Sequence, residues 1–323
     1  MEKGRALIEI KNLSVDYKVK EGYLSAVKNA DLTINKGEIF ALIGESGCGK
    51  STIAYTIMKL LFSENERVSG EILFEGRDLL KATEREMEDI RGRDIGMIFQ
   101  NPLDSLNPVY RSADQVAEAI MLDGIDRKQA WNKVLELYRS VRIPDSEKRM
   151  KSFPHELSGG MRQRVMIAMM LARNPKLLIA DEPTTALDVT IEAQILSIIR
   201  GLRAQFDTSI LIITHNFGIV AEVADKIAVM YAGEIVELGD VFQIFSAPMH
   251  PYTRALMLAL PRVRKHERRL ATIPGSVPKL IGDIPGCRFA NRCACAADVC
   301  ASEAPPLRTA KDGHIYRCHR EAF

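Results

Sequence analysis

The stretch that decides the fold is Gly44-Glu45-Ser46-Gly47-Cys48-Gly49-Lys50-Ser51, which has the pattern G-x-x-x-x-G-K-S. A short apolar run (38–43) precedes it, and a helix-length stretch (52–62) with spaced aliphatic residues follows it. This order of strand, glycine loop and helix is typical of a phosphate-binding P-loop, because the loop turns backbone N–H groups and a helix N-terminus toward the phosphates. The pattern predicts Lys50 on the β- and γ-phosphates and the Ser51 hydroxyl on Mg²⁺. We interpret Cys48 as a packing residue.

Length and composition narrow the class of protein. A chain of 323 residues is long enough for one large or two modest domains. The 44 basic residues nearly balance the 42 acidic ones, so the charge of +2 does not favour nucleic acid as a partner. The sequence has no long apolar window, and strand-like residues follow the start directly. We therefore expect no membrane span, no signal peptide and a cytosolic protein.

Three further strands are expected to deliver polar side chains to one edge of a sheet. Residues 177–180 form an apolar run that ends in Asp181 and Glu182. Ligands collect at the carboxyl ends of parallel strands, so Asp181 is expected in the Mg²⁺ shell and Glu182 as the base for the attacking water. Gln100 follows the buried strand 95–99 in the same way. His215 follows the strand 209–214 and could contact a γ-phosphate, although a lone histidine is usually structural.

Other segments of the chain complete the expected nucleotide site. Residues 7–17 alternate in apolar character and predict a strand ending at Tyr17, which could stack on a base or simply end the strand. Residues 112–150 predict an amphipathic helical insertion. Ser158, Gly159 and Gly160 precede an apolar helix and predict an N-cap with a second phosphate site. Residues 226–239 predict two short strands. We find no internal repeat, which indicates a single nucleotide-binding unit.

With these residues in place, the chain resembles the ATP-binding subunit of an ABC transporter over residues 7–245. The resemblance implies an α/β fold: a P-loop cassette with a mixed β-sheet core, an antiparallel β subdomain and an inserted helical subdomain over about 101–165. It also implies a cassette at 1–245 and a small cysteine-rich extension at 246–323. The residues that it assigns to ATP and Mg²⁺ are Tyr17, Gly44, Glu45, Ser46, Gly47, Cys48, Gly49, Lys50, Ser51, Thr52, Gln100, Ser158, Gly159, Gly160, Asp181, Glu182, Asp188 and His215.

One departure from the general family pattern and the sequence of the tail point to a branch of the family. Met161 stands where the general signature has glutamine, a form that is similar to the oligopeptide and dipeptide importers. Three tail segments, 245–256, 274–278 and 286–293, also resemble the extension of peptide and nickel import ATPases. The cargo stays open between dipeptides, oligopeptides, a nickel chelate and other compounds.

The resemblance also implies the partners of the chain. Two cassettes would pack head to tail with ATP between them, and the second cassette is often a paralogous polypeptide. Two transmembrane permease subunits and an extracytoplasmic peptide-binding protein would complete the transporter, with this chain peripheral on the cytoplasmic face. A soluble ABC ATPase that acts on DNA or ribosomes is the alternative class. It is disfavoured because the chain has neither a tandem cassette nor a large insertion, and no nucleic acid partner is expected.

Four cysteines in the tail predict a metal centre. Cys287, Cys293, Cys300 and Cys318 have the spacing C-x₅-C-x₆-C-x₁₇-C in a segment with few apolar residues, where a metal would supply cross-links. Four thiolates suit zinc or an iron–sulfur cluster, although zinc sites usually have tighter pairs. The resemblance favours a structural [4Fe–4S] cluster over zinc, with Cys295 as a spare. A redox sensor acting on the ATPase is a further alternative without a supporting motif.

Overall fold

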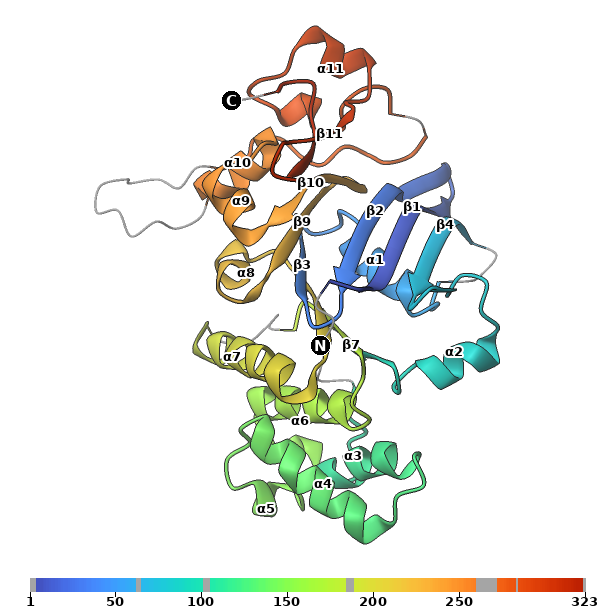
Figure 1. Cartoon of the computed structure of the whole chain (residues 1–323), viewed down its shortest axis with the longest axis vertical. Coiled ribbons are helices and arrows are strands. Elements are labelled where there is room, and N and C mark those ends of the chain that lie inside the picture. Colours follow the sequence, from blue (N-terminus) through green and yellow to red (C-terminus); the bar gives the residue numbers. More distant parts are fainter. Residues whose placement is uncertain are drawn as a thin grey trace, which may run out of the picture. The chain divides into compact units, whose positions relative to one another are not determined.

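A computed structural model of the chain describes residues 4–61, 65–100, 105–183, 189–259, 272–282 and 284–321. The chain forms two compact units. Unit 1 comprises Lys36–Ile39 and Thr83–Ile213, and unit 2 comprises Gly4–Asn35, Phe40–Ala82 and Thr214–Phe323. Figure 1 labels the elements of both units along the chain.

Unit 1 is built on three parallel strands that run β6–β7–β8. They are β6 (Ile95–Ile98), β7 (Leu177–Asp181) and β8 (Ser209–Thr214), and each of their residues is buried. Parallel strands are covered on both faces, which explains why the central residues of these strands form continuous apolar runs rather than alternating ones. The structure thus confirms the strands predicted at 95–99, 177–181 and 209–214.

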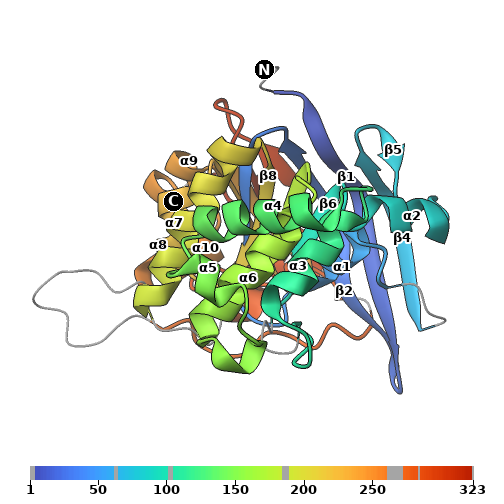
Figure 2. The same ribbon diagram turned by 90° about the horizontal axis from the view of Figure 1, so that it is seen from below.

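Helices make up most of the remainder of unit 1 (Figure 2). They are α2 (Glu84–Ile90), α3 (Ser112–Met121), α4 (Arg127–Ser140), α5 (Ser146–Arg149), the 3₁₀ helix η2 (Pro154–Glu156), α6 (Gly159–Leu171) and α7 (Val189–Phe206). The predicted helical insertion over 112–150 is confirmed as α3, α4 and α5. Its predicted core residues are all buried: Val116, Ile120, Val134, Leu137 and Tyr138. Asp126 caps α4 by accepting hydrogen bonds from the N–H groups of Lys128 and Gln129.

Unit 2 contains an antiparallel sheet with the strand order β2–β1–β4–β5. Its strands are β1 (Ala6–Val19), β2 (Gly22–Asn35), β4 (Glu66–Phe74) and β5 (Arg77–Asp78). The strand predicted over 7–17 is confirmed as β1, and the expected antiparallel subdomain is this sheet. Strand β2 was not predicted, although it is one of the two longest strands among the described residues.

A mixed sheet also lies in unit 2. Strand β3 (Ile39–Ile43) pairs in parallel with β9 (Lys226–Tyr231), whereas β9, β10 (Glu234–Asp240), β12 (Ile315–Arg317) and β11 (Leu307–Thr309) follow one another antiparallel. The two strands predicted in 226–239 are confirmed as β9 and β10. Strands β11 and β12 were not predicted, and they attach the end of the chain to the edge of β10.

The helices of unit 2 are mostly short. They are α1 (Lys50–Ile57), α8 (Phe217–Val223), α9 (Val241–Ser246), α10 (Pro251–Ala259), the 3₁₀ helix η3 (Ala290–Arg292) and α11 (Asp298–Ser302). The helix after the glycine loop is therefore shorter than the stretch 52–62 indicated. It ends at Ile57, and Lys59 has a left-handed backbone with φ 50°, a conformation that terminates helices.

One apolar cluster joins the tail to the strands of unit 2. The rings of Tyr231, Tyr252 and Phe289 lie with centroids 4.6 to 5.4 Å apart, and Leu280 belongs to the same cluster. Ile43, the last residue of β3, is also a member. Residues beyond 245 thus share a hydrophobic core with the strand that leads into the glycine loop.

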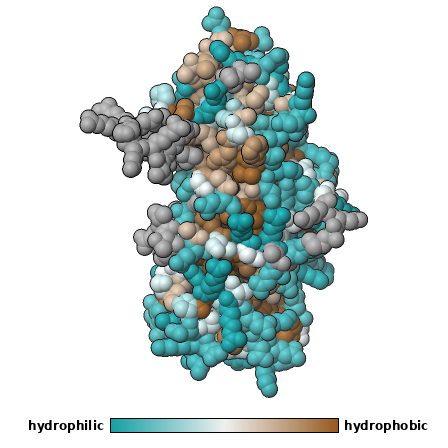
Figure 3. Space-filling model, turned by 60° about the vertical axis from the view of Figure 1, so that its left-hand side comes forward, coloured by the Kyte–Doolittle hydropathy of each residue, from teal (hydrophilic) through white to brown (hydrophobic). Residues whose placement is uncertain are grey.

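The surface of the molecule is mostly hydrophilic on the face shown in Figure 3, with smaller hydrophobic areas between. Exposed large apolar side chains include Val109, Tyr110, Leu122 and Phe242. Within the described ranges, no helix combines the length and the apolar character that crossing a membrane requires.

Candidate functional site

The glycine loop of unit 2 lies between β3 and α1, as the sequence predicted. A Cβ atom on Gly44 would lie 2.1 Å from the Met230 carbonyl oxygen, and one on Gly49 would lie 2.2 Å from the Ala26 carbonyl oxygen. Gly49 also has φ 104°, which side-chain-bearing residues rarely adopt. Both positions therefore require glycine, because the loop packs directly against neighbouring backbone.

Lys50 is the first residue of α1, and its side chain is folded back over the loop. Its Nζ donates hydrogen bonds to the carbonyl oxygens of Gly44 and Glu45, both at 2.9 Å. The Cys48 sulfur lies 3.8 Å from the same nitrogen, and burial raises the pKa of this thiol despite the nearby ammonium. Cys48 is fully buried, which agrees with a packing role.

The structure brings Tyr17 of β1 close to the start of α1. The Tyr17 hydroxyl lies 3.4 Å from Thr52 Oγ1, and the Tyr17 ring is half-buried. Burial raises the pKa of this phenol, while the contact with Thr52 lowers it. Two of the predicted nucleotide-binding residues, Tyr17 and Thr52, are therefore neighbours beside the glycine loop.

Unit 1 brings together three other predicted residues at the carboxyl ends of its strands. Asp181 is fully buried as the last residue of β7, and Glu182 follows it. Gln100, just beyond β6, donates a hydrogen bond from Nε2 to Glu182 Oε2 at 3.0 Å. Glu182 has φ 46°, so a non-glycine residue occupies a left-handed conformation at the edge where ligands are expected.

The backbone around Glu182 holds that strained conformation. Its N–H donates to the Ile213 carbonyl of β8 at 2.9 Å, and the Gln163 side chain of α6 donates to the Pro183 carbonyl at 2.7 Å. Gln163 is completely buried. The backbone of residues 182 and 183 is thus held from two sides, by β8 and by α6.

Ser158 is the N-cap of α6, as predicted, and its Oγ accepts a hydrogen bond from Met161 N–H at 3.3 Å. The helix begins at Gly159 rather than near Val165, so Gly159 and Gly160 form its first turn. Ser158 is exposed and Gly160 is buried. The first turn of a 13-residue helix is therefore open at Ser158.

Of the predicted nucleotide residues outside the glycine loop and α1, His215 and Asp188 remain. His215 lies at the bend after β8 and is exposed. Asp188 lies outside the described residues, as do residues 101–104 of the expected helical subdomain.

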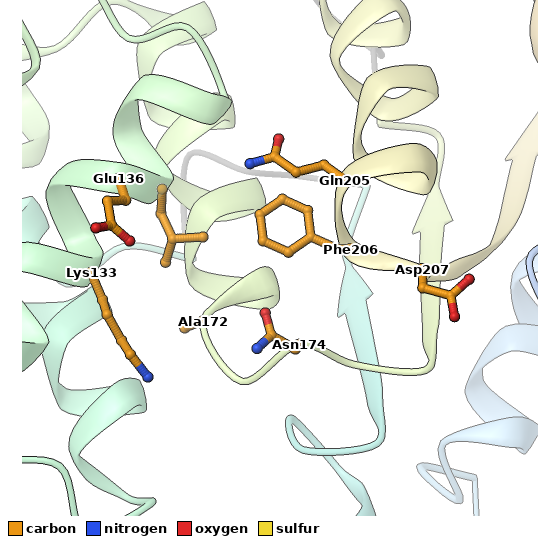
Figure 4. A pocket seen from close by; sticks show the side chains of 8 residues that line it. Lys133, Glu136, Ala172, Asn174, Gln205, Phe206 and Asp207 are labelled. Atoms are coloured by element: carbon orange, nitrogen blue, oxygen red, sulfur yellow. The ribbon is translucent and has the colours of Figure 1, made fainter.

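A large hollow in unit 1 contains none of the predicted site residues. It has a volume of about 510 Å³ and is lined by residues of α4, of the α6–β7 connection and of the end of α7 (Figure 4). Phe206 points into it, with Lys133 and Glu136 on the opposite side. The lining mixes both charge signs and has no glycine loop, so we do not assign nucleotide to it.

Two tail residues that the sequence analysis did not single out contact the glycine loop. The Arg292 guanidinium binds both carboxylate oxygens of Glu45, at 2.7 and 3.0 Å. The Glu45 N–H donates to the Tyr252 hydroxyl at 3.0 Å. Both residues lie in tail segments that the sequence matched to a family, but the match gave no indication of what they touch.

The four predicted metal-binding cysteines line one small cavity of about 20 Å³, together with Cys295 and two histidines. Burial raises the pKa of Cys287 to about 11, and the thiols of Cys300, Cys293 and Cys318 add to this effect. In the part of the chain that the structure describes, no three His, Cys, Asp or Glu side chains form a group that could hold a metal ion. The thiols therefore converge without the arrangement of a single-ion site.

Comparisons with known proteins agree with this arrangement. Residues 27–185 match the ABC transporter family, and residues 236–300 match the C-terminal region of oligopeptide/dipeptide transporters. The oligopeptide transport ATP-binding protein OppD of Bacillus subtilis is 48% identical, with 96% of this chain and 88% of that protein covered. OppD of Salmonella typhimurium is 44% identical, with 97% and 93% covered.

A solved structure gives the same result for the fold. The ATP-binding cassette MJ0796, in a dimeric post-hydrolysis state bound to ADP and phosphate, is 26% identical with a TM-score of 0.65. The alignment covers 72% of this chain and 98% of that cassette. The glycine loop, the acidic strand end and these similarities lead to one conclusion: this chain is an ATPase of the ABC transporter family, in its oligopeptide/dipeptide branch.

Proposed function

We propose that the chain is the ATP-hydrolysing subunit that powers import of dipeptides or oligopeptides through a membrane transporter. The observation that carries the proposal is the similarity of almost the whole chain to two oligopeptide transport ATP-binding proteins. The match at 236–300 strengthens it, because this region lies outside the ABC transporter match at 27–185.

In the proposed site, residues 44–52 surround the triphosphate and Lys50 binds its β- and γ-phosphates. Ser51, Asp181 and Gln100 would hold Mg²⁺, which would supply positive charge beside the phosphates. The fully buried Asp181 carboxylate and the Ser51 hydroxyl are oxygen ligands of the kind that Mg²⁺ prefers. Tyr17, next to Thr52, stacks on the base.

Glu182 is the proposed general base, which takes a proton from the water that attacks the γ-phosphate. Its hydrogen bond from Gln100 and its fixed backbone support this role, since a base must be held in one direction to act on a bound water. His215 is proposed to contact the γ-phosphate. Gln100 then reports the state of that phosphate to the helical insertion that follows it in the chain.

A second cassette is proposed to complete each nucleotide site. Ser158, Gly159 and Gly160, together with Asp188, would contact the nucleotide bound by the partner. The exposed N-cap at Ser158 supports this, because the N-terminus of a 13-residue helix carries partial positive charge toward phosphate. ATP would then bridge two helix N-termini, and hydrolysis would remove the bridge and open the dimer.

The proposed assembly has three other kinds of component. They are two transmembrane permease subunits, a second and paralogous ATPase, and an extracytoplasmic peptide-binding protein. The chain would be peripheral on the cytoplasmic face of the membrane. We also propose a functional division into a cassette at 1–245, whose helical subdomain is about 101–165, and an extension at 246–323.

For the extension, we propose a structural [4Fe–4S] cluster on Cys287, Cys293, Cys300 and Cys318. The convergence of these four thiols on one small cavity supports it, and thiolates are the ligands that such clusters use. Zinc on the same four thiolates is the alternative.

The function can be tested by reconstitution. The chain would be co-expressed with the permeases, the second ATPase and the peptide-binding protein of the proposed assembly, and the complex placed in liposomes that contain ATP. We expect uptake of a radiolabelled peptide that stops in the Glu182→Gln complex. Uptake of nickel or a sugar without any peptide would overturn the proposed cargo. Co-purification with nucleic acid in place of membrane subunits would overturn the proposed class.

A further inference from the structure

Glu45, the second residue of the glycine loop, is held by the tail through both its side chain and its backbone. Arg292 grips the carboxylate with two parallel hydrogen bonds, from Nη1 at 2.7 Å and from Nη2 at 3.0 Å. Such bidentate pairs are strong and fix direction as well as distance. The Tyr252 hydroxyl accepts from Glu45 N–H, and Lys50 Nζ donates to the Glu45 carbonyl. Glu45 is therefore in contact with the nucleotide-binding lysine and with the tail.

The Arg292 side chain is built into the tail rather than attached to its surface. Only 6% of the side chain is exposed. Its Nε donates to the Pro274 carbonyl at 2.8 Å, and its guanidinium also reaches the Ile273 carbonyl and the Tyr231 hydroxyl, both at 3.4 Å. The pKa of Arg292 is raised, first by the hydrogen bond with Glu45 and against the effect of burial. The guanidinium thus has a fixed position from which to hold the carboxylate.

A carboxylate on a phosphate-binding loop disfavours the binding of a negatively charged ligand. It repels a triphosphate, and it competes for Lys50, whose ammonium already lies 2.9 Å from the Glu45 carbonyl oxygen. Arg292 counters both effects, because it neutralises the carboxylate and holds it in a bidentate pair. Within the loop sequence 44–51, Lys50 is the one cationic residue, so a carboxylate released from Arg292 would compete for it.

The position of Arg292 depends in turn on the cysteine-rich segment. Arg292 is the last residue of η3 and directly precedes Cys293. The turn is closed by hydrogen bonds from Ala290 N–H to the Cys287 carbonyl at 3.0 Å and from Cys293 N–H to the Ala290 carbonyl at 3.2 Å. Opening of the turn between Cys287 and Cys293 therefore moves the guanidinium that holds Glu45.

We propose that Arg292 is a positioning residue of the nucleotide site, which holds the Glu45 carboxylate away from Lys50 and the phosphates. The affinity of the loop for ATP then depends on the turn between Cys287 and Cys293, which carries Arg292. This inference rests on ATP binding by the glycine loop, but it requires neither a peptide cargo nor a particular metal in the tail.

The test is a set of equilibrium titrations of the full chain with ATP, read by calorimetry. Arg292→Ala should weaken ATP binding about tenfold, the change that 1.4 kcal/mol produces. The double variant Arg292→Ala/Glu45→Gln should recover most of that loss, because no carboxylate is released. Arg292→Lys should fall between wild type and Arg292→Ala, since lysine keeps the charge without the bidentate grip.

Arg308→Ala is the matched control. Arg308 forms another Arg–Glu ion pair of the tail, with Glu321 at 2.8 Å, and its bonds are to the tail segment that includes Cys318 and His319. We expect this variant to bind ATP as wild type does. Wild-type affinity in Arg292→Ala, an equal loss in Arg308→Ala, or no recovery in the double variant would each overturn the proposal. Absence of ATP binding in the wild-type chain would instead contradict the proposed nucleotide site itself.

Discussion

Gln100 donates a hydrogen bond to the Glu182 carboxylate across the ends of two strands, with 3.0 Å between Nε2 and Oε2. The two residues are 82 positions apart in the chain, and the parallel pairing of β6 with β7 makes them neighbours. Of the residues that the sequence assigned to hydrolysis, these two are in direct contact within unit 1. The contact couples the proposed base to the residue that begins the connection to the helical insertion.

Glu182→Gln should bind ATP but hydrolyse it about 10²–10³ times more slowly, because the amide cannot take a proton from the attacking water. The measurement is the single-turnover rate with labelled ATP in the assembled complex, alongside a nucleotide-binding titration. Glu136→Gln, on α4 at the remote hollow, is the control and should hydrolyse at the wild-type rate. Wild-type turnover in Glu182→Gln would show that another group is the base.

Lys50→Ala should abolish productive ATP binding, because the ammonium is the proposed partner of the β- and γ-phosphates. Filter binding or calorimetry with ATP measures the effect. Lys18→Ala removes an exposed lysine of β1 and should leave the affinity unchanged. Lys50 also bonds two loop carbonyls, so circular dichroism must establish that the variant is folded. A folded Lys50→Ala protein with wild-type affinity would contradict the assignment.

The isolated chain should be mostly monomeric and a weak ATPase, because half of each proposed site comes from a second cassette. Sedimentation velocity with ATP and with the slowly hydrolysing Glu182→Gln variant measures the association. Addition of the paralogous ATPase should produce a mixed dimer. If the chain alone forms a stable homodimer with full activity, the need for a paralogue is refuted.

His250 should make the protein less stable in acid. The imidazole is buried and its Nδ1 accepts from Tyr252 N–H at 3.0 Å, and burial lowers its pKa from 6.5 to about 3. Because the unfolded chain binds the proton more readily, this group lowers the free energy of unfolding as pH falls below about 6.5 and continues to do so down to about pH 3.

The variant His250→Asn keeps an acceptor for Tyr252 N–H but has no titrating group. Its free energy of unfolding, measured with urea between pH 7.5 and pH 4, should fall less steeply than that of the wild type. A constant offset between the two proteins at every pH reflects packing alone. Parallel pH profiles would therefore contradict a buried neutral His250.

The cysteine cavity should bind a metal centre when the protein is purified without oxygen. We expect brown protein with iron and acid-labile sulfide near stoichiometric, as a [4Fe–4S] cluster requires. Cys287→Ser should lose the centre, whereas Cys295→Ser should keep it, and these two form a matched pair. Colourless protein with one zinc per chain would show that the metal is zinc and not a cluster. Loss of the centre only in Cys295→Ser would overturn the set of ligands.

The local elements of this protein follow closely from the sequence. The runs 177–180 and 210–213 are apolar without interruption because parallel strands are buried on both faces, and that pattern is visible without a structure. The glycine loop can likewise be recognised from the sequence, since close backbone packing requires glycine at positions 44 and 49. The family also follows from motifs of this kind, which carry their chemistry in consecutive residues.

Contacts between distant segments were decided by the tertiary structure. Strand β2 has no motif of its own, and β11 and β12 are only three residues each, so their pairing could not be recognised from local patterns. The Arg292–Glu45 pair spans 247 positions, and each residue alone is an ordinary charged side chain. Such a pair has no sequence signal, because its energy depends on burial and geometry that only the packed core of Tyr231, Tyr252 and Phe289 provides.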